Sequence, residues 1–498
     1  MAKSIIIIGA GMGGLAAGVY GRINGYETRI FEMQAKPGGQ CTSWSRRGHT
    51  FDPCLHHFFG CKPGTSVNRM WHELGALPRG VVPLADCVTV ASADGRTFAD
   101  YYDLGKLEET LLELAPADAK PIRQYVKAIR TFARKNVGDM MDGGSMWKKI
   151  VRFPAMLPVL KWMKMDMRTF AARFSDPFLK RAFALLVYSN PEAPLFFHLL
   201  RHAGGLDGDI RWPIGGAGEF ARSIEKRYLA LGGSVRYGSR VEKILVEDDK
   251  AVGIRLADGA EHRADIVISN ADGRRTISRM LEGRYLNDTV RGYCAPMTDE
   301  TPFAVDVFLG VDRDLSGEPS SLIILLDEPA TIAGHPCDSL ETQLYGFDTS
   351  MAPPGKGTIK VELTASYAYW KKLYEGDREA YRQEKQTVAE QVIGILDRRF
   401  PGLKSQVDVI DVSTLLTWER YMGGSQGWFN FPNRKLDFSL GEEMTDKKFK
   451  TTLPGLANFY LVGVWATMMG SLAHNAHSGK TIVRRLCKSD GKEFRAEP

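Results

Sequence analysis

Three glycines near the start of the chain have the spacing of a loop that binds a dinucleotide. The stretch IIIIGAGMGG places Gly9, Gly11 and Gly14 in the pattern G-x-G-x-x-G, directly after four isoleucines. Glu32 follows at about the spacing, roughly 20 residues, at which an acid accepts hydrogen bonds from a ribose 2′-hydroxyl. A carboxylate there repels a 2′-phosphate, so we expect a cofactor with a free ribose, FAD or NAD, rather than NADP.

The residues around the glycines predict the strand, helix and strand that such a loop needs. Residues 5–8 are short, apolar and β-branched, which is typical of a buried strand. Residues 15–20 continue with helical spacing, and residues 27–31 predict a second strand that ends at Glu32. In such a unit the glycines allow the backbone to approach the pyrophosphate, and the N-terminus of the helix faces the phosphates.

Histidines are the titratable candidates for acid–base chemistry. His56 and His57 lie in FDPCLHHFFG, and His474 and His477 lie in GSLAHNAHSG. An unperturbed imidazole titrates near pH 6.5, so each can give or take a proton near neutrality. The alternative is that they hydrogen-bond the backbone or the cofactor structurally. The sequence shows no Ser-His-Asp set, paired carboxylate motif or cluster of metal ligands, so we expect no metal.

Composition bounds the class of protein. The 498 residues are 44% hydrophobic and 25% charged, as in an ordinary globular protein. A net charge of +6, from 65 basic and 59 acidic residues, is too balanced to indicate a nucleic-acid partner. Seven cysteines without C-x-x-C spacing argue against a disulfide framework and a structural zinc site. No apolar stretch approaches the ~18 residues of a membrane-spanning helix, so we expect a cytoplasmic protein that crosses no membrane.

One segment, residues 146–170, has the composition of a helix at a lipid surface. It combines Trp147, Trp162 and aliphatic residues with one acid, Asp166, and with the basic residues Lys148, Lys149, Arg152, Lys161, Lys164 and Arg168. Cationic, Trp-bearing amphipathic helices commonly lie in membrane interfaces, so peripheral membrane contact is one expectation. The alternative is a helix whose apolar side is simply core.

Several stretches, in order along the chain, resemble the family of phytoene desaturases, carotenoid isomerases and retinol saturases. They are IIIIGAGMGGLAAGVYGRINGYETRIFEMQAKPGGQ, FSDPFLKRAFALLVYSNPEAPLFF, the block at residues 213–272 with ADIVISNADG, and NFYLVGV and GSLAHNAHSG near the end. The first stretch is shared with many flavoproteins, whereas the 213–272 block narrows the choice to this group. FDPCLHHFFG is similar to the retinol saturase form, in which a histidine follows F-D at the position of His56. The resemblance makes FAD the expected cofactor.

The resemblance also implies which residues hold FAD. These are Gly9, Gly11, Gly13 and Gly14 along the pyrophosphate, Glu32 on the adenosine ribose, the second glycine pair Gly38 and Gly39 with Gln40 beside it, Val241 at the adenine, and Gly463, Val464, Leu472 and Ala473 at the ribityl chain and flavin ring. A helix N-terminus at the last two stabilises the negative charge of reduced flavin. The chain departs from the family pattern where Val464 replaces an acid and where no proline follows Gly470.

We therefore expect an α/β protein with two interleaved parts. A Rossmann-type FAD-binding domain of the GR2 or amine-oxidase-like kind comes from residues 1–104, 205–290 and 451–498, and a mixed α+β domain for a lipid substrate comes from residues 105–204 and 291–450. The expected enzyme is an FAD-dependent oxidoreductase acting on CH–CH groups. It desaturates, saturates or isomerises carbon–carbon double bonds of an isoprenoid, carotenoid or retinoid-like lipid, with His56 ranked first as the acid–base residue.

Two other classes stay open. A flavin amine oxidase shares the fold but acts on a polar amine, usually through an aromatic cage at the flavin. A prenyl-binding escort protein of the GDP-dissociation-inhibitor type shares the fold but carries no flavin. The 213–272 block favours the desaturase side, and the intact glycine loop argues against the escort.

Overall fold

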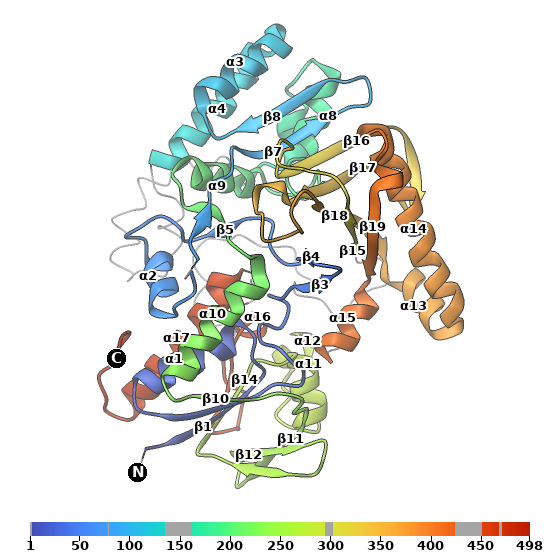
Figure 1. Ribbon diagram of the computed structural model, residues 1–498. Helices are drawn as coiled ribbons and strands as arrows, with labels where there is room; N and C mark the ends of the chain where they lie inside the picture. Colours follow the sequence, from blue (N-terminus) through green and yellow to red (C-terminus); the bar gives the residue numbers. More distant parts are fainter. Residues whose placement is uncertain are drawn as a thin grey trace.

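The computed structural model (Figure 1) describes most of the chain. The described ranges are 2–77, 79–134, 162, 164–293, 302–423, 451–467 and 471–498. Most of the segment 146–170, for which a helix at a lipid surface is expected, lies outside these ranges, so that expectation stays a prediction. Within the described ranges, no helix is long and apolar enough to span a bilayer.

A five-stranded parallel sheet carries the glycine loop at the end of its first strand. The strands lie in the order β10-β2-β1-β14-β20. Their bounds are Ser4–Ile8 (β1), Glu27–Phe31 (β2), Ser234–Arg236 (β10), Ile266–Ser269 (β14) and Phe459–Leu461 (β20). Three distant segments of the chain thus share one sheet, with β1 at its centre, where both faces must be covered.

The four isoleucines of β1 divide between two cores, because successive side chains of a strand point to opposite faces. Ile5 and Ile7 pack with three helices, whereas Ile6 and Ile8 pack with a three-stranded antiparallel sheet. These covering elements are α1 (Met12–Ile23), α10 (Gly216–Ala230), α17 (Leu472–Ser489), β11 (Val241–Glu247), β12 (Lys250–Leu256) and β13 (Glu261–Arg263). The layered, Rossmann-type arrangement expected from the sequence is confirmed.

A seven-stranded sheet forms the second large layer. Its order is β19-β15-β18-β17-β16-β7-β8, and its neighbours are antiparallel except for the parallel pair β16 and β7. The bounds are Asp86–Ala91 (β7), Thr97–Tyr101 (β8), Pro302–Val311 (β15), Ser321–Ile332 (β16), His335–Leu344 (β17), Gly357–Ser366 (β18) and Val407–Ser413 (β19). One face packs against α13 (Tyr367–Gly376), α14 (Arg378–Arg399) and α15 (Leu415–Met422).

A layer of helices lies at the β7–β8 end of this sheet (Figure 1). It comprises α3 (Leu104–Leu114), α4 (Ala119–Arg134), α7 (Met167–Ala171), α8 (Pro177–Leu185) and α9 (Leu195–Leu206). The sequence predicts the start of α8, where the Asp176 carboxylate accepts a hydrogen bond from Leu179 N at 2.9 Å. We expected residues 86–101 in the FAD-binding domain, as part of the range 1–104. Instead they form β7 and β8, which pair with the seven-stranded sheet. The division into two domains otherwise stays a prediction.

Short elements connect the two large sheets. They include β3 (Trp44–Arg46), β4 (His49–Phe51), β5 (Phe58–Phe59), β6 (Val81–Val82), β9 (Ile210–Pro213), α2 (Ser66–Glu73), α11 (Gly273–Arg275), α12 (Asp288–Tyr293) and α16 (Val464–Thr467). The loop between β4 and β5 contacts the seven-stranded sheet, since Lys360 Nζ on β18 donates to Pro53 O at 3.5 Å. Next to the sheet, the hydroxyl of Tyr345, the residue after β17, donates to Asp52 O at 3.0 Å. This loop carries His56.

Candidate active site

The glycine loop after β1 leaves room only for backbone. A Cβ on Gly14 would lie 2.1 Å from the carbonyl oxygen of Gly9, and a Cβ on Gly13 would lie 2.7 Å from the backbone nitrogen of Gly463. Gly11 is the N-cap of α1, and among the described residues no side chain caps this helix. The N–H groups of its first turn therefore stay available to an anion such as a pyrophosphate.

The second glycine pair lies against the first loop. The N–H of Gly38 donates to the carbonyl of Ala10 at 2.9 Å, and a Cβ on Gly39 would lie 3.5 Å from the Cα of Gly11. Both glycines have positive φ, +110° and +63°, which side-chain-bearing residues rarely adopt. Through these contacts the two glycine motifs meet in one site, which we call the glycine cradle. Gln40 follows Gly39 directly.

Glu32 ends β2 beside this cradle. It is buried, and its two carboxylate oxygens accept hydrogen bonds from Ala10 N at 2.7 Å and Gln34 N at 2.8 Å. Burial raises the pKa of the carboxyl, and the N–H donors oppose that rise. Ser239 N donates to Glu32 O at 2.8 Å, which brings Val241, two residues later, to the same end of the sheet. This geometry suits the ribose and adenine contacts expected of the two residues.

The side chain of Asn270, which follows β14, lies against three of the glycines that we expect to hold FAD. A Cβ on Gly11, Gly13 or Gly463 would meet the Asn270 side-chain amide at 2.4, 2.7 and 2.3 Å respectively. Gly463 has φ +82°, and its N–H donates to Ser478 Oγ at 2.8 Å. The sequence analysis missed Asn270. Its signal was a polar residue at the carboxyl end of an apolar strand, within ADIVISNADG.

The remaining C-terminal candidates begin two helices. Val464 starts α16, and Leu472 and Ala473 start α17, whose N-cap Ser471 makes no side-chain capping hydrogen bond to the described residues. The helix α17 packs closely on α1, because a Cβ on Gly479 would lie 2.4 Å from the carbonyl oxygen of Gly13. The start of α17 therefore lies near the glycine cradle. The N-terminus of a helix there would stabilise negative charge on a bound flavin ring.

The His56 loop is fastened to the same region by Asp52. One Asp52 oxygen accepts from Cys54 N and Leu55 N at 2.9 and 3.1 Å, and the other accepts from Ala217 N at 2.6 Å, in the first turn of α10. The Cys41 thiol donates to the carbonyl oxygen of the same Ala217 at 3.6 Å, and the N–H of Cys41 donates to Gly38 O at 3.0 Å. The loop thus lies next to the second glycine pair.

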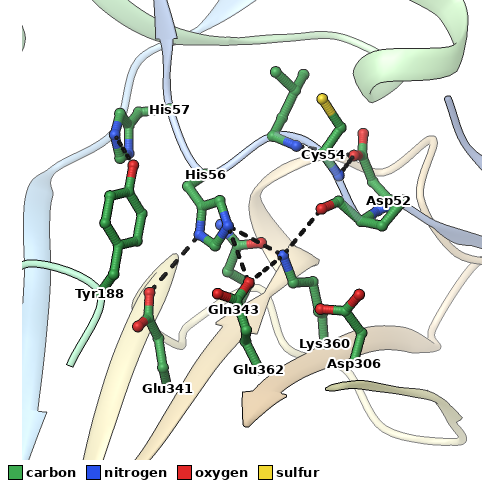
Figure 2. A network of polar contacts seen from close by, with 12 residues as sticks. Asp52, Cys54, His56, His57, Tyr188, Asp306, Glu341, Gln343, Lys360 and Glu362 are labelled. Atoms are coloured by element: carbon green, nitrogen blue, oxygen red, sulfur yellow. Dashed lines mark hydrogen bonds and ion pairs between the residues drawn. The ribbon is translucent and has the colours of Figure 1, made fainter. Parts of the chain in front are cut away.

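His56 contacts charged side chains through both ring nitrogens (Figure 2). Its Nε2 lies 3.2 Å from Glu362 Oε2 and 3.3 Å from Lys360 Nζ, and its Nδ1 lies 3.8 Å from Glu341 Oε1. Burial lowers the pKa of His56, Lys360 lowers it further, and Glu362 opposes the change. The pKa of His56 therefore lies below the unperturbed value near 6.5, which favours the neutral imidazole at pH 7.

Three carboxylates lie side by side on neighbouring strands below His56. Asp306 on β15 is the cross-strand partner of Glu362 on β18, which is the partner of Glu341 on β17. Lys360, 1% exposed, lies two positions before Glu362 on the same face, with its Nζ 3.3 Å from Glu362 Oε2. We call Asp306, Glu341, Lys360 and Glu362, together with His56, the acid–base cluster.

The acid–base cluster holds its groups at unusual pKa values. Burial raises the pKa of Asp306 to about 7, with Lys360 opposing and Glu362 adding. Burial and Glu362 raise the pKa of Glu341 to about 8. Burial also disfavours the charged form of Glu362, but Lys360 and His56 outweigh it and lower the pKa. Perturbed pairs of this kind are common at active sites.

The three charged contacts of His56, and Asp306 beside them, were not predicted from the sequence. The signal for Asp306, Lys360 and Glu362 was charged residues inside otherwise apolar strands, in FAVDVFLGV and GTIKVELTASY, whereas Glu341 lies in the mixed stretch HPCDSLETQL. The other histidine candidates lie outside the acid–base cluster. His57 Nε2 contacts the hydroxyl of Tyr188 at 3.0 Å, and His474 and His477 occupy the first turns of α17, half-buried and exposed.

A second buried polar cluster lies between β8 and the helical layer. The Asp100 carboxylate accepts from Tyr125 Oη at 2.8 Å and lies 3.1 Å from His198 Nε2 and 3.3 Å from His202 Nε2. Arg201 Nη2 lies 3.4 Å from His198 Nδ1, so a guanidinium balances the buried carboxylate. Burial lowers the pKa of His198 to about 4, although Asp100 opposes the change.

Comparison with known proteins identifies the family. Residues 12–487 match the flavin-containing amine oxidoreductases. The chain belongs to this family. It is an oxidoreductase and FAD is its cofactor, which the glycine cradle fits, and the expected fold class is confirmed. The alternative of a flavin-free escort protein is thereby wrong.

The curated relatives are similar at low identity over long stretches. A prolycopene isomerase from Daucus carota is 25% identical over 85% of this chain and 71% of its own length. Prolycopene isomerase 1 of an Oncidium hybrid is 24% identical over 99% of this chain and 85% of its own length. A lycopene-forming phytoene desaturase from Pseudescherichia vulneris is 25% identical over 93% of this chain and 94% of its own. The resemblance to carotenoid desaturases and isomerases is confirmed.

Solved structures share the fold. An oxidoreductase from Methanosarcina mazei superposes with a TM-score of 0.62 at 18% identity, over 97% of this chain and 100% of its own. A putrescine oxidase gives 0.58 at 13% identity over 98% and 99% of the two chains. At these identities the likeness speaks for the fold alone.

Proposed function

We propose that this protein is an FAD-dependent oxidoreductase that changes carbon–carbon bonds of an isoprenoid or similar apolar lipid, by desaturation, saturation or cis–trans isomerisation. The observation that carries the proposal is the position of the acid–base cluster. It includes the histidine of the loop that follows the second glycine pair. Asp52 of that loop and Cys41, which follows the glycine pair, both hydrogen-bond Ala217 at the start of α10.

In this proposal the two halves of the chemistry come from different places. FAD supplies the two-electron chemistry at its ring, and the protein supplies binding, orientation and the proton. The two glycine loops hold the pyrophosphate, and Glu32 and Val241 hold the adenosine end. Adding or removing hydrogen across a double bond moves one proton besides the hydride, and His56 is the residue placed to give or take it.

The relatives support the substrate class. Prolycopene isomerases and phytoene desaturases match nearly the whole chain. We therefore propose an apolar, polyene-like lipid as the substrate and a membrane as its source.

The three reactions leave different traces on the flavin, so one experiment separates them. The purified holoprotein is mixed anaerobically with phytoene or prolycopene in liposomes. Loss of oxidised-flavin absorbance, together with a product two hydrogens poorer, supports desaturation. Conversion of prolycopene to an isomer without net flavin change supports isomerisation. Reoxidation of chemically reduced flavin by the lipid supports saturation.

One observation favours a second candidate, a flavin amine oxidase. Three carboxylates gather on one sheet face, and the exposed ring of Tyr188 lies 5.1 Å from that of His56, so an ammonium group would find negative charge and an aromatic face there. Lys360 weighs against it, because its own ammonium already pairs with Glu362. Anaerobic flavin reduction by putrescine or benzylamine, with no response to either lipid, would establish this candidate and contradict the first.

A further inference from the structure

The acid–base cluster contains more carboxylates than cations. Asp306, Glu362 and Glu341 occupy adjacent cross-strand positions, and directly opposed side chains have Cβ atoms only about 5 Å apart. Among the described residues, Lys360 is the one lysine that forms an ion pair with these carboxylates, and its partner is Glu362. Like charges at such spacing do not all ionise near neutral pH, so the cluster retains a proton.

We infer that Glu341 is the resting holder of this proton and exchanges it with His56, while Glu362, itself paired with Lys360, holds the imidazole in place. The inference rests on the proposed function and deepens it, because it names the residue from which the proton of the lipid reaction comes. Glu341 was not singled out by the sequence.

The contacts distinguish Glu341 from the other two carboxylates. Glu362 touches both Lys360 and His56, so its ionised form is stabilised. Asp306 accepts a hydrogen bond from Ser413 Oγ at 3.0 Å and, among the described residues, forms no ion pair with His56. Among the described residues, Glu341 forms an ion pair with His56 alone, at 3.8 Å, and with no lysine or arginine. The pKa of about 8 that burial and Glu362 give Glu341 agrees with this geometry.

The surroundings of Glu341 contain further charged and titratable groups. Arg201 on α9 lowers its pKa and thereby opposes the protonated form, as does Lys360. His57 and Tyr188 form a neighbouring pair, with ring centroids 5.9 Å apart. Burial lowers the pKa of His57 well below its usual value, so it adds no positive charge at pH 7. The side chains of Glu341 and His56 are 11% and 18% exposed, so the pair reaches accessible space.

The proton balance follows from the two ring nitrogens of His56. With Nε2–H donating to Glu362, Nδ1 has a free lone pair that accepts the proton of Glu341 once a small side-chain rotation closes the 3.8 Å gap. In saturation, bound FAD would supply a hydride to one carbon of the double bond, and the Nδ1–H of the imidazolium, turned from Glu341 toward the lipid, would supply this proton to the other carbon. Glu341 is left as a carboxylate and regains a proton from solvent. Desaturation runs the same transfers in reverse.

Infrared spectroscopy of the holoprotein tests the resting state without any substrate. A protonated carboxyl group absorbs apart from a carboxylate and shifts in D2O. We expect the difference between wild type and Glu341→Gln to contain such a band at pH 7, lost on titration with a midpoint near 8. The matched control is Glu328→Gln, an exposed glutamate on β16, for which we expect no such band. A band that survives Glu341→Gln and disappears in Asp306→Asn would overturn the inference.

Turnover tests the exchange with His56. With whichever of phytoene or prolycopene the wild type converts, we expect Glu341→Gln to lower kcat by about 10²-fold or more at unchanged KM and flavin content. Glu341→Asp, which still holds a proton, should recover part of the rate. A kcat within twofold of wild type in Glu341→Gln would overturn the inference. If the wild type converts neither lipid, the proposed function fails, and the infrared difference alone decides whether Glu341 holds the proton.

Discussion

His56 has two different environments at its two ring nitrogens. Nε2 faces a carboxylate and an ammonium, those of Glu362 and Lys360, whereas Nδ1 faces Glu341. The ammonium favours the neutral imidazole and the carboxylate favours the cation, and burial tips the balance toward neutral. At the scale of the residue, His56 is thus a base that needs a neighbouring acid before it can donate a proton.

Replacement of His56 separates its chemical role from a structural one. His56→Gln keeps a polar side chain of similar size, so we expect normal FAD content and normal reduction by dithionite, with lipid turnover lowered by about 10²-fold or more. His72→Gln, at an exposed position of α2, is the matched control and should behave as wild type. Full turnover by His56→Gln would show that the histidine is structural.

At the scale of elements, close contacts between helices set the shape of the cofactor site. The helix α17 approaches α1 so closely that Gly479 faces the carbonyl of Gly13 and the backbone of Ala17. Any side chain at 479 must push α17 outward. Because Gly13 also lies against Gly463, such a shift would deform the cradle where the first glycine loop meets Gly463.

The substitution Gly479→Ala measures that closeness. Its Cβ would lie 2.4 Å from a backbone oxygen, so we expect a loss of about 1–3 kcal/mol in the free energy of unfolding and weaker FAD retention. The control is Gly394→Ala on α14, where a Cβ meets nothing within 4 Å among the described residues. It should stabilise the protein by about 0.5–1 kcal/mol. Chemical denaturation measures the free energy of unfolding of both variants. Equal changes in the two would contradict this account.

The helix α9 makes stability depend on pH through His198. Its pKa is about 4 in the folded protein and about 6.5 when unfolded. Between these values the unfolded chain binds the extra proton, so acidification from pH 6.5 to 4 costs stability, by at most about 1.4 kcal/mol per pH unit. We expect His198→Gln to lose less stability than wild type over this range. A wild-type slope that matches the variant's would contradict the prediction, and His72→Gln controls for loss of an exposed histidine.

At the scale of the whole molecule, the chain passes repeatedly between its two large sheets. The five-stranded sheet draws strands from the start, the middle and the end of the sequence, and the seven-stranded sheet takes the segments between them. The site lies where the loop after β4 contacts both parts. A lipid substrate would reach this site from a membrane, and residues 146–170 are the segment that the sequence predicts to contact one.

Vesicle binding tests that membrane contact. Changing Lys148, Lys149, Lys161 and Lys164 to glutamate should release the protein from anionic vesicles, since each basic residue near such a surface contributes about 1 kcal/mol. The control makes the same change in net charge at the exposed residues Lys120, Lys371, Lys372 and Lys404, and it should still bind. Sedimentation with vesicles measures both, and absence of wild-type binding would contradict the prediction.

Features that depend on residues close together along the chain could be predicted from the sequence, whereas features that depend on contacts between distant segments could not. The strand, glycine loop and helix at residues 4–23 lie within one local pattern, and so do the capped start of α8 and the long helix α14. Asp306, Glu341 and Glu362 become neighbours only through the register of three paired strands, which local patterns do not specify. The same holds for β7 and β8, whose apolar alternation does not reveal which sheet they join.

The position of β20 and α17 has a consequence for how the protein is made. The strand β1 and helix α1 leave the ribosome well before β20 and α17, which complete their sheet and cover α1 and follow more than 400 positions later. At roughly 5–20 residues per second, the N-terminal unit waits on the order of tens of seconds with part of its apolar surface uncovered. Gly463 and the start of α17 also arrive only then. Stable cofactor loading is therefore post-translational, and a chaperone that shields nascent apolar strands would raise the yield of active protein.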